Sequence, residues 1–198
     1  MNVKTLIPSD CSKVAELHLK AFPSFFLSGL GKSFLTAFYK SIIKHSDGIA
    51  VGIFDNQTVV AFAIGSSKKR GFYTIILKKN GLRLLLKSLP SLLRSPQNII
   101  RLLMALKTKD SNEDYILNNA TLLSICVNNS NTEKGMGSKI ITAFEELAFS
   151  SSESISLTTD ATNNDYVNNF YQKNGYLLLK QFNQGNRKMN LYNKTKNA

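Results

Sequence analysis

The stretch Thr132-Glu133-Lys134-Gly135-Met136-Gly137 decides the predicted fold, because of what stands on either side of it. Before it, Ala120 to Val127 is a run of apolar and β-branched residues that predicts a strand. From Lys134 to Phe149, apolar residues recur at helical spacing, and over Glu153 to Thr159 they return to alternation. The order strand, helix, strand is a crossover unit with a glycine turn at its front.

The glycine turn presents backbone N–H groups and the positive end of a helix to one small volume, which is a cradle for phosphate. Glycine at 135 and 137 lets a ligand approach the backbone where a Cβ would collide with it. A Gly-x-Gly alone is an ordinary tight turn about half the time. A P-loop is excluded because no Lys-Ser/Thr closes a longer glycine loop, and a dinucleotide fingerprint is excluded because the third glycine is missing.

The remaining patterns predict a mixed α/β domain. Ser9 or Asp10 is expected to cap a first helix, which Pro23 stops. The other expected elements are a strand at 3–6, a helix at 34–43, an antiparallel pair at 48–54 and 58–65, a short helix at 164–173 and final strands at 176–182 and 188–192.

Ser66 to Lys109 is a basic segment with eleven Lys or Arg and no acidic residue. Its apolar residues predict amphipathic helices punctuated by Pro90 and Pro96. We therefore predict one domain over 1–198 with a helical insertion at 66–118, between the third and fourth strands. The leucine content favours packing against the core or a second subunit, and the alternatives are an anionic lipid surface or a substrate site. The apolar residues are Leu82, Leu85, Leu86 and Leu89, then Ile99, Ile100, Leu102, Leu103 and Leu106.

Composition limits which kinds of binding partner and cellular setting are expected. The 198 residues, 43% of them hydrophobic, suffice for one core. Cys11 and Cys126 have no neighbouring Cys or His at metal-ligand spacing, so no disulfide framework or metal site is expected, and the setting is predicted to be cytoplasmic. No signal peptide or membrane span is predicted. The net charge of +12 indicates an anionic partner, but no nucleic-acid recognition element is present, which favours a phosphorylated small molecule or a membrane surface.

Two motifs resemble those of the GNAT N-acetyltransferase superfamily. Thr132 to Gly137 is similar to Gln/Arg-x-x-Gly-x-Gly/Ala, and it begins five residues after the strand-end Val127. Asn164 to Tyr176 is similar to the second signature, an Asn seven residues before a Tyr that precedes Gly-Phe. Thr132 departs from the usual Gln or Arg. The resemblance implies a mostly antiparallel sheet of about six to seven strands, splayed between strands four and five and flanked by helices.

The same resemblance implies an acyl-CoA site and a direct transfer without a covalent acyl-enzyme. Pantetheine would lie between the strands at 120–127 and 153–159, and backbone groups there would polarise the thioester carbonyl. Tyr171 would protonate the departing thiolate, and Asn164 would bind the cofactor arm. Cys126 is expected to be buried and structural rather than a nucleophile. The implied cofactor residues are Cys126, Val127, Thr132, Glu133, Lys134, Gly135, Met136, Gly137, Ser138, Asn164 and Tyr171. Lys134 or Lys139 could replace the charge that Thr132 lacks.

A neutral amine must attack, so a base is needed. Asp160, at the end of the fifth strand, is the candidate that we carry forward with Tyr171 as catalytic. Glu113, Asp114 and His18 are further candidates, and His45 is a weaker one. Each of these residue types is as readily structural or solvated as catalytic.

The acceptor is predicted from the apolar stretch Ala21 to Leu35, which holds four aromatic residues, three of them clustered at 22–26, where the resemblance implies the border of an acceptor pocket. The N-terminal pattern resembles GNAT proteins of bacterial surface-polysaccharide synthesis, which acylate a nucleotide-linked amino sugar. Two pyrophosphate-bearing substrates would also account for the positive charge. The alternative acceptors are a small-molecule amine and a protein amine, and a homodimer is possible.

Overall fold

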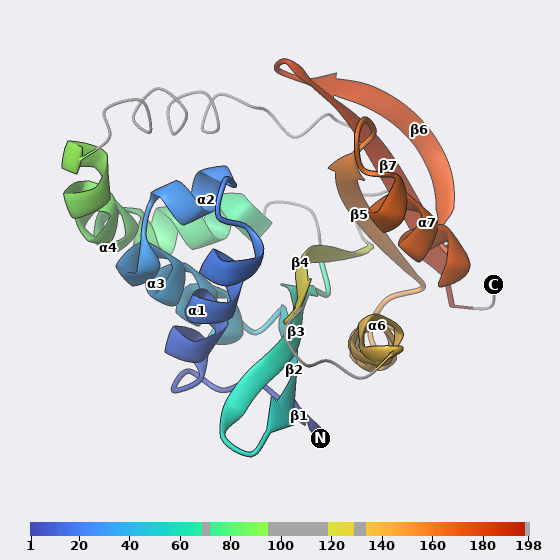
Figure 1. Cartoon of the computed structure of the whole chain (residues 1–198), viewed down its shortest axis with the longest axis horizontal. Coiled ribbons are helices and arrows are strands. Elements are labelled where there is room, and N and C mark those ends of the chain that lie inside the picture. Colours follow the sequence, from blue (N-terminus) through green and yellow to red (C-terminus); the bar gives the residue numbers. More distant parts are fainter. Residues whose placement is uncertain (69–71, 95–118, 129–133, 197–198) are drawn as a thin grey trace.

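The protein is described from a computed structural model that places residues 1–68, 72–94, 119–128 and 134–196 (Figure 1). A seven-stranded sheet in the order β1-β2-β3-β4-β5-β7-β6 runs through it. The strands are β1 Asn2–Thr5, β2 Gly48–Asp55, β3 Thr58–Ser66, β4 Ala120–Val127, β5 Ser154–Asp160, β6 Leu177–Gln184 and β7 Arg187–Thr195. The helices are α1 Cys11–Ala21, α2 Phe26–Gly29, α3 Lys32–Ile43, α4 Phe72–Arg94, α6 Met136–Ala148 and α7 Asp165–Lys173.

The sheet is antiparallel except between β4 and β5, which are parallel and joined through α6. These two strands pair only at Ala120 with Ile155 and Thr121 with Ser156. Beyond those pairs they separate, while β4 stays paired with β3 and β5 with β7. The predicted fold class, a mixed sheet splayed between the fourth and fifth strands, is confirmed.

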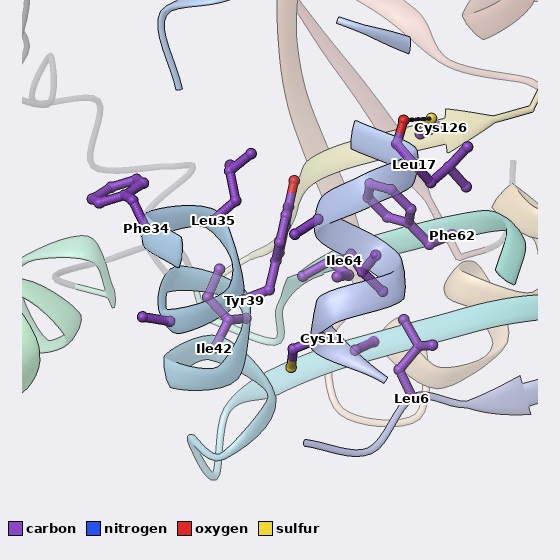
Figure 2. Packing of buried hydrophobic residues seen from close by; sticks show 14 of the residues in the cluster. Leu6, Cys11, Leu17, Phe34, Leu35, Tyr39, Ile42, Phe62, Ile64 and Cys126 are labelled. Atoms are coloured by element: carbon purple, nitrogen blue, oxygen red, sulfur yellow. Dashed lines mark hydrogen bonds between the residues drawn. The ribbon is translucent and has the colours of Figure 1, made fainter. Parts of the chain in front are cut away.

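Each face of the sheet carries its own apolar core. Phe62 and Ile64 of β3 point to the side of α1 and α3, whereas Ala61 and Ala63 point to the side of α6. This alternation follows from the two-residue period of a strand, and a strand buried on both faces reads as a continuous apolar run. Figure 2 shows the core on the α1 and α3 side.

The expected cap of α1 is wrong. Asp10 occupies the N-cap position but makes no side-chain hydrogen bond to the first turn of α1. Its Oδ2 instead accepts a hydrogen bond from the Ile7 N–H at 3.0 Å, because the chain turns back between β1 and α1. The carboxylate therefore closes the preceding turn rather than the helix.

The first helix of the basic segment forms as α4, with two corrections. Pro90 lies inside α4 and does not end it. The leucines expected to pack on the core or a second subunit, Leu82 among them, are exposed and so do not pack on the core, where the helix buries Phe72, Ile76, Leu84 and Leu92 instead. The spacing of those four residues follows the face that meets α3. Residues 95–118, with the apolar group at 99–106, Glu113 and Asp114, lie outside the described residues.

Among the helices that the structure describes, none combines the length and the apolar character needed to cross a bilayer.

Candidate active site

The opening between β4 and β5 provides backbone groups without a partner strand. A parallel pair normally bonds along its whole length, but here the register ends at Thr121 and Ser156 although β4 continues to Val127 and β5 to Asp160. The inner edges of both strands therefore offer N–H and C=O groups to an extended ligand, as a sheet edge does in strand addition. Cys126 and Val127 lie at the β4 end of this opening.

The first turn of α6 begins at a glycine and adjoins a small cavity. Gly135, its N-cap residue, has φ +86°, a conformation in which glycine is unstrained, and among the described residues no side chain caps the helix. The first N–H groups of a helix have no intrahelical partner, and they carry the positive end of the dipole. A cavity of about 70 Å³ lies at this end, lined by Lys134 and Lys139 together with Met1, Ile53, Gly135 and Met136. The two lysines thus flank the turn. Thr132 and Glu133 lie outside the described residues.

Gly137 lies close to Phe170 of α7. A Cβ at this position would lie 3.0 Å from Cε2 of Phe170, which is closer than such contacts normally come. The absence of a side chain therefore lets the first turn of α6 approach α7, whereas the sequence suggested only that it lets a ligand approach. Phe170 adjoins Tyr171, so the two signature motifs meet through this contact.

Tyr171 lies in an aromatic cluster on the α6 side of the sheet. Its side chain is 6% exposed, and its ring centroid is 5.3 Å from Phe170, 5.8 Å from Tyr176 and 5.9 Å from Tyr192. Burial raises the pKa of the Tyr171 phenol well above its usual value. At neutral pH the phenol keeps its proton, which is the state that a general acid needs.

Asn168, which the sequence analysis missed, fixes α7 against the sheet. Its Nδ2 donates to the Asp160 carbonyl at 3.1 Å, and its Oδ1 accepts from Asn190 Nδ2 at 2.9 Å and from the Tyr192 hydroxyl at 3.1 Å. The side chain is buried. A polar residue on the inner face of a short helix was the available signal, but its partners depend on the pairing of β5 with β7.

Asn164 lies where its motif places it, at the N-cap of α7. Its Nδ2 donates to Thr159 Oγ1 at 2.9 Å and to the Asp160 carbonyl at 3.1 Å. The amide nitrogen therefore holds the end of β5, and Oδ1 is the atom that remains to accept from a ligand.

Asp160 pairs with Arg187 at the open end of the sheet. Arg187 Nε donates to Oδ1 at 2.9 Å and its Nη2 donates to Oδ2 at 2.6 Å, a bidentate arrangement. The same guanidinium lies 5.9 Å from the ring centroid of Phe25, in the loop before α2. Because Arg187 belongs to β7 and Phe25 lies between α1 and α2, this contact joins the C-terminal strands to the N-terminal helices.

His18 lies behind Phe25 and is 2% exposed. Its Nδ1 lies 2.7 Å from the Tyr39 hydroxyl, which donates to Ser124 Oγ on β4 at 3.2 Å. Which of the two groups donates in the His18–Tyr39 hydrogen bond depends on the tautomer of His18. The His18 Nε2 is buried without a hydrogen-bond partner among the described residues. Burial lowers the pKa of His18 to about 4, so the imidazole is neutral at pH 7.

Cys126 is placed as expected for a structural residue. Its thiol is buried beside the Leu17 carbonyl, at 3.9 Å, and burial raises its pKa to about 12 (Figure 2). A thiol that holds its proton is a poor nucleophile. Within residues 1–68, 72–94, 119–128 and 134–196, no three His, Cys, Asp or Glu side chains gather as metal ligands.

Solved structures share this arrangement. Aminoglycoside 6'-acetyltransferase type Ii is similar at 14% identity, with 98% of this chain and 97% of that chain covered and a TM-score of 0.63. An acetyltransferase of the GNAT family from Streptococcus pneumoniae matches at 15% identity, 98% and 98% coverage and a TM-score of 0.57. The fold is that of the GNAT acetyltransferases. PaiA N-acetyltransferase from Thermoplasma acidophilum, solved in complex with coenzyme A, shares it at 13% identity, 98% and 99% coverage and a TM-score of 0.58.

At the level of sequence, no protein-family model matches the chain, and no curated protein does. The likeness is therefore one of fold. Fold alone does not assign a reaction, so the chemistry has to be argued from the site.

Proposed function

We propose that this protein is an N-acyltransferase that moves an acetyl or longer acyl group from acyl-CoA to a primary amine. The observation that carries this proposal is the splay of β4 from β5 with the uncapped, lysine-flanked start of α6 beside it. An extended pantetheine arm can add to the open strand edge, and a pyrophosphate can bind the helix N-terminus. PaiA N-acetyltransferase, which shares the fold, binds coenzyme A.

The cofactor seat that we propose, meaning the pyrophosphate-binding site at the start of α6, consists of backbone N–H groups and lysine side chains. The N–H groups of Met136, Gly137 and Ser138 in the first turn of α6 would bind the pyrophosphate, with Lys134 and Lys139 supplying positive charge. Those lysines would replace the Gln or Arg side chain that the GNAT motif usually has where this chain has Thr132. Backbone groups near Cys126 and Val127 would bind the pantetheine and polarise the thioester carbonyl.

We assign protonation of the leaving CoA thiolate to Tyr171. When the amine attacks, the C–S bond breaks and the leaving thiolate needs a proton. The raised pKa of Tyr171 keeps its phenol protonated until that moment. Asn164 Oδ1 would accept a hydrogen bond from the cofactor arm, while its Nδ2 stays bound to the end of β5.

The base has two candidates beside the opening. Both oxygens of Asp160 accept from Arg187, which engages the carboxylate. His18 is neutral at pH 7, and its Nε2 is buried without a hydrogen-bond partner among the described residues. We therefore propose that Asp160 positions Arg187 and that His18, in the tautomer with an unprotonated Nε2, takes up the proton through a water molecule. The catalytic role first predicted for Asp160 stays a prediction, which Asp160→Asn tests against His18→Gln. His45 lies against Phe72, between α3 and α4.

The acceptor that we favour is a nucleotide-linked amino sugar of the kind used in polysaccharide synthesis. Arg187, stacked over Phe25 at the opening, provides a cation for a phosphate next to an aromatic face for a base or sugar. A small-molecule amine or a protein amine is the alternative, because the fold is shared with an aminoglycoside acetyltransferase.

The cofactor seat is tested by calorimetry with acetyl-CoA on wild type and Ser138→Glu. A glutamate in the first turn favours the helix but repels a pyrophosphate, so affinity should fall at least about tenfold while the fold persists. Ser33→Glu is the matched control, since Ser33 is exposed in the first turn of α3. Equal affinity in Ser138→Glu and wild type would exclude this seat. A panel of amines, with free thiol release as the signal, then identifies the acceptor.

A further inference from the structure

Helix α4 has an apolar face that the described part of the chain leaves uncovered. α4 packs against α3 through Phe72, Ile76, Leu84 and Leu92. Its outward side carries a second row, the leucine face, which consists of Ile75, Leu82, Leu86, Leu89 and Leu93 with exposed fractions of 36, 74, 56, 40 and 80%. Steps of seven, four, three and four residues put this row on one side of a helix. Single exposed leucines are ordinary, but a contiguous row marks an interaction surface.

The flanks of the leucine face are basic. Lys78 lies on one side and Lys79, Arg83 and Lys87 on the other, as the helical period places them, and no acidic residue occurs in 72–94. In Figure 1, the labelled end of α4 lies at the outer margin of the molecule, and β5 and β7 lie on the opposite side of the view.

A basic cavity adjoins the same flank. It has a volume of about 250 Å³ and lies between the end of α3 and the middle of α4. No acidic side chain is among its lining residues, which are Lys40, Ser41, Lys44, His45, Ser46, Lys79, Asn80 and Arg83. Lys79 and Arg83 therefore belong both to the cavity and to the border of the leucine face. Several cations around one cavity suit a phosphate group.

We propose that α4 binds an anionic phospholipid bilayer, with the leucine face in the acyl region and the basic cavity receiving a phosphate headgroup. An amphipathic helix with a Lys- and Arg-rich border lies in the plane of such an interface. A second copy of the chain fits less well, because a facing α4 would bring the same cations against Lys79 and Arg83. A nucleic acid would match the charge but leave the leucine face in water. This membrane contact does not depend on acyl transfer.

Sedimentation with lipid vesicles tests the contact on the full chain. Wild type should bind phosphatidylcholine vesicles that contain about one-third phosphatidylglycerol at least about tenfold more tightly than pure phosphatidylcholine vesicles. The quadruple variant Leu82→Gln/Leu86→Gln/Leu89→Gln/Leu93→Gln should lose at least about tenfold in affinity for the anionic vesicles. Glutamine is a good helix former, so α4 should persist.

Matched control variants distinguish binding through this surface from non-specific vesicle binding by other exposed leucines and lysines. Leu177→Gln/Leu179→Gln removes two leucines of β6 that are 67% and 46% exposed, and it should bind vesicles as wild type does. Lys79→Gln/Arg83→Gln should lose most of the preference for phosphatidylglycerol, whereas Lys173→Gln/Lys196→Gln, equal in charge change, should keep it.

Three results would overturn the membrane contact. The first is wild type that does not bind the anionic vesicles, and the second is a quadruple variant that binds them undiminished. The third is a wild-type dimer, seen by light scattering, that the quadruple variant converts to a monomer without any vesicle binding, which would assign the leucine face to a second copy. If circular dichroism shows that the quadruple variant is unfolded, Leu82→Gln and Leu93→Gln singly, the most exposed positions, decide the same question.

Discussion

At the residue scale, the proton-donor role proposed for Tyr171 can be tested, because three aromatic rings surround its buried side chain and burial raises the pKa of its phenol. Tyr171→Phe preserves the ring packing and removes only the hydroxyl. We expect kcat to fall by about 10²-fold or more, the usual range for a lost general acid, with acetyl-CoA affinity nearly unchanged. Steady-state turnover and calorimetry measure the two quantities. Tyr166→Phe, on the same helix and 86% exposed, is the control, and wild-type turnover in Tyr171→Phe would remove the assigned role.

His18 makes a prediction about stability and pH. Its pKa is about 4 in the folded chain and about 6.5 in the unfolded chain, so on acidification the unfolded chain takes up the proton first. The contribution of the neutral imidazole to stability is therefore complete above pH 6.5 and is lost as the pH falls toward 4. Between pH 7.5 and 4.5 the free energy of unfolding should drop by about 2 to 3 kcal/mol more in wild type than in His18→Gln. Urea unfolding at both pH values measures this, and equal drops would contradict it.

Single residues differ in how far the sequence predicts them. Tyr171 and Asn164 can be proposed from the sequence, because both lie in one motif whose spacing is local. Arg187 and Asn168 are not found, because their roles arise where β7 pairs with β5 and α7 packs on both. Such contacts join positions that no local pattern connects. The assignment of the general base to Asp160 or His18 likewise depends on hydrogen-bond partners distant in sequence. Asp160 is bound by Arg187, and His18 is bound by Tyr39.

At the element scale, α7 should depend on Asn168 for its attachment to the sheet. Asn168→Leu removes the donor to the Asp160 carbonyl and leaves Asn190 and Tyr192 without their acceptor in a buried site. An unsatisfied buried polar group costs about 1 to 3 kcal/mol, so the variant should lose at least that much unfolding free energy. Asn169→Leu, at the exposed neighbouring position, should lose little. Urea unfolding of both variants provides the measurement, and equal stabilities would contradict the attachment.

The elements themselves were largely predictable because their apolar periods are long and regular. β4 has the bounds expected from Ala120 to Val127, and α6 follows the glycine turn as its pattern indicates. In α4 the helix was predicted and its buried face was not. Leucines occur on both sides of α4, so the sequence alone does not reveal which side meets α3. The prediction that Pro90 separates two helices was wrong, because a proline inside a long helix is tolerated at some cost in stability.

At the scale of the whole molecule, the excess of positive charge should act on the rate at which anionic substrates arrive. A net charge of +12 surrounds the protein with a positive potential, and acyl-CoA is a polyanion, so their encounter is steered at low ionic strength. We expect the association rate constant of acetyl-CoA to fall by about tenfold when ionic strength rises from about 0.02 M to about 0.3 M, because the screening length shortens to below about 10 Å.

Steering concerns the encounter, so the dissociation rate constant and kcat at saturating substrate should change much less over the same range. Stopped-flow binding of a fluorescent acyl-CoA, together with turnover at saturating acetyl-CoA, separates these quantities. Lys134→Gln/Lys139→Gln removes two charges beside the proposed pyrophosphate seat, and Lys173→Gln/Lys196→Gln removes two elsewhere. If the net charge governs arrival, both pairs should lower the association rate alike. If the local charge at α6 governs it, only the first pair should lower the association rate. An association rate that does not change with salt would contradict steering, and membrane binding at the leucine face and its basic border would then account for the positive charge.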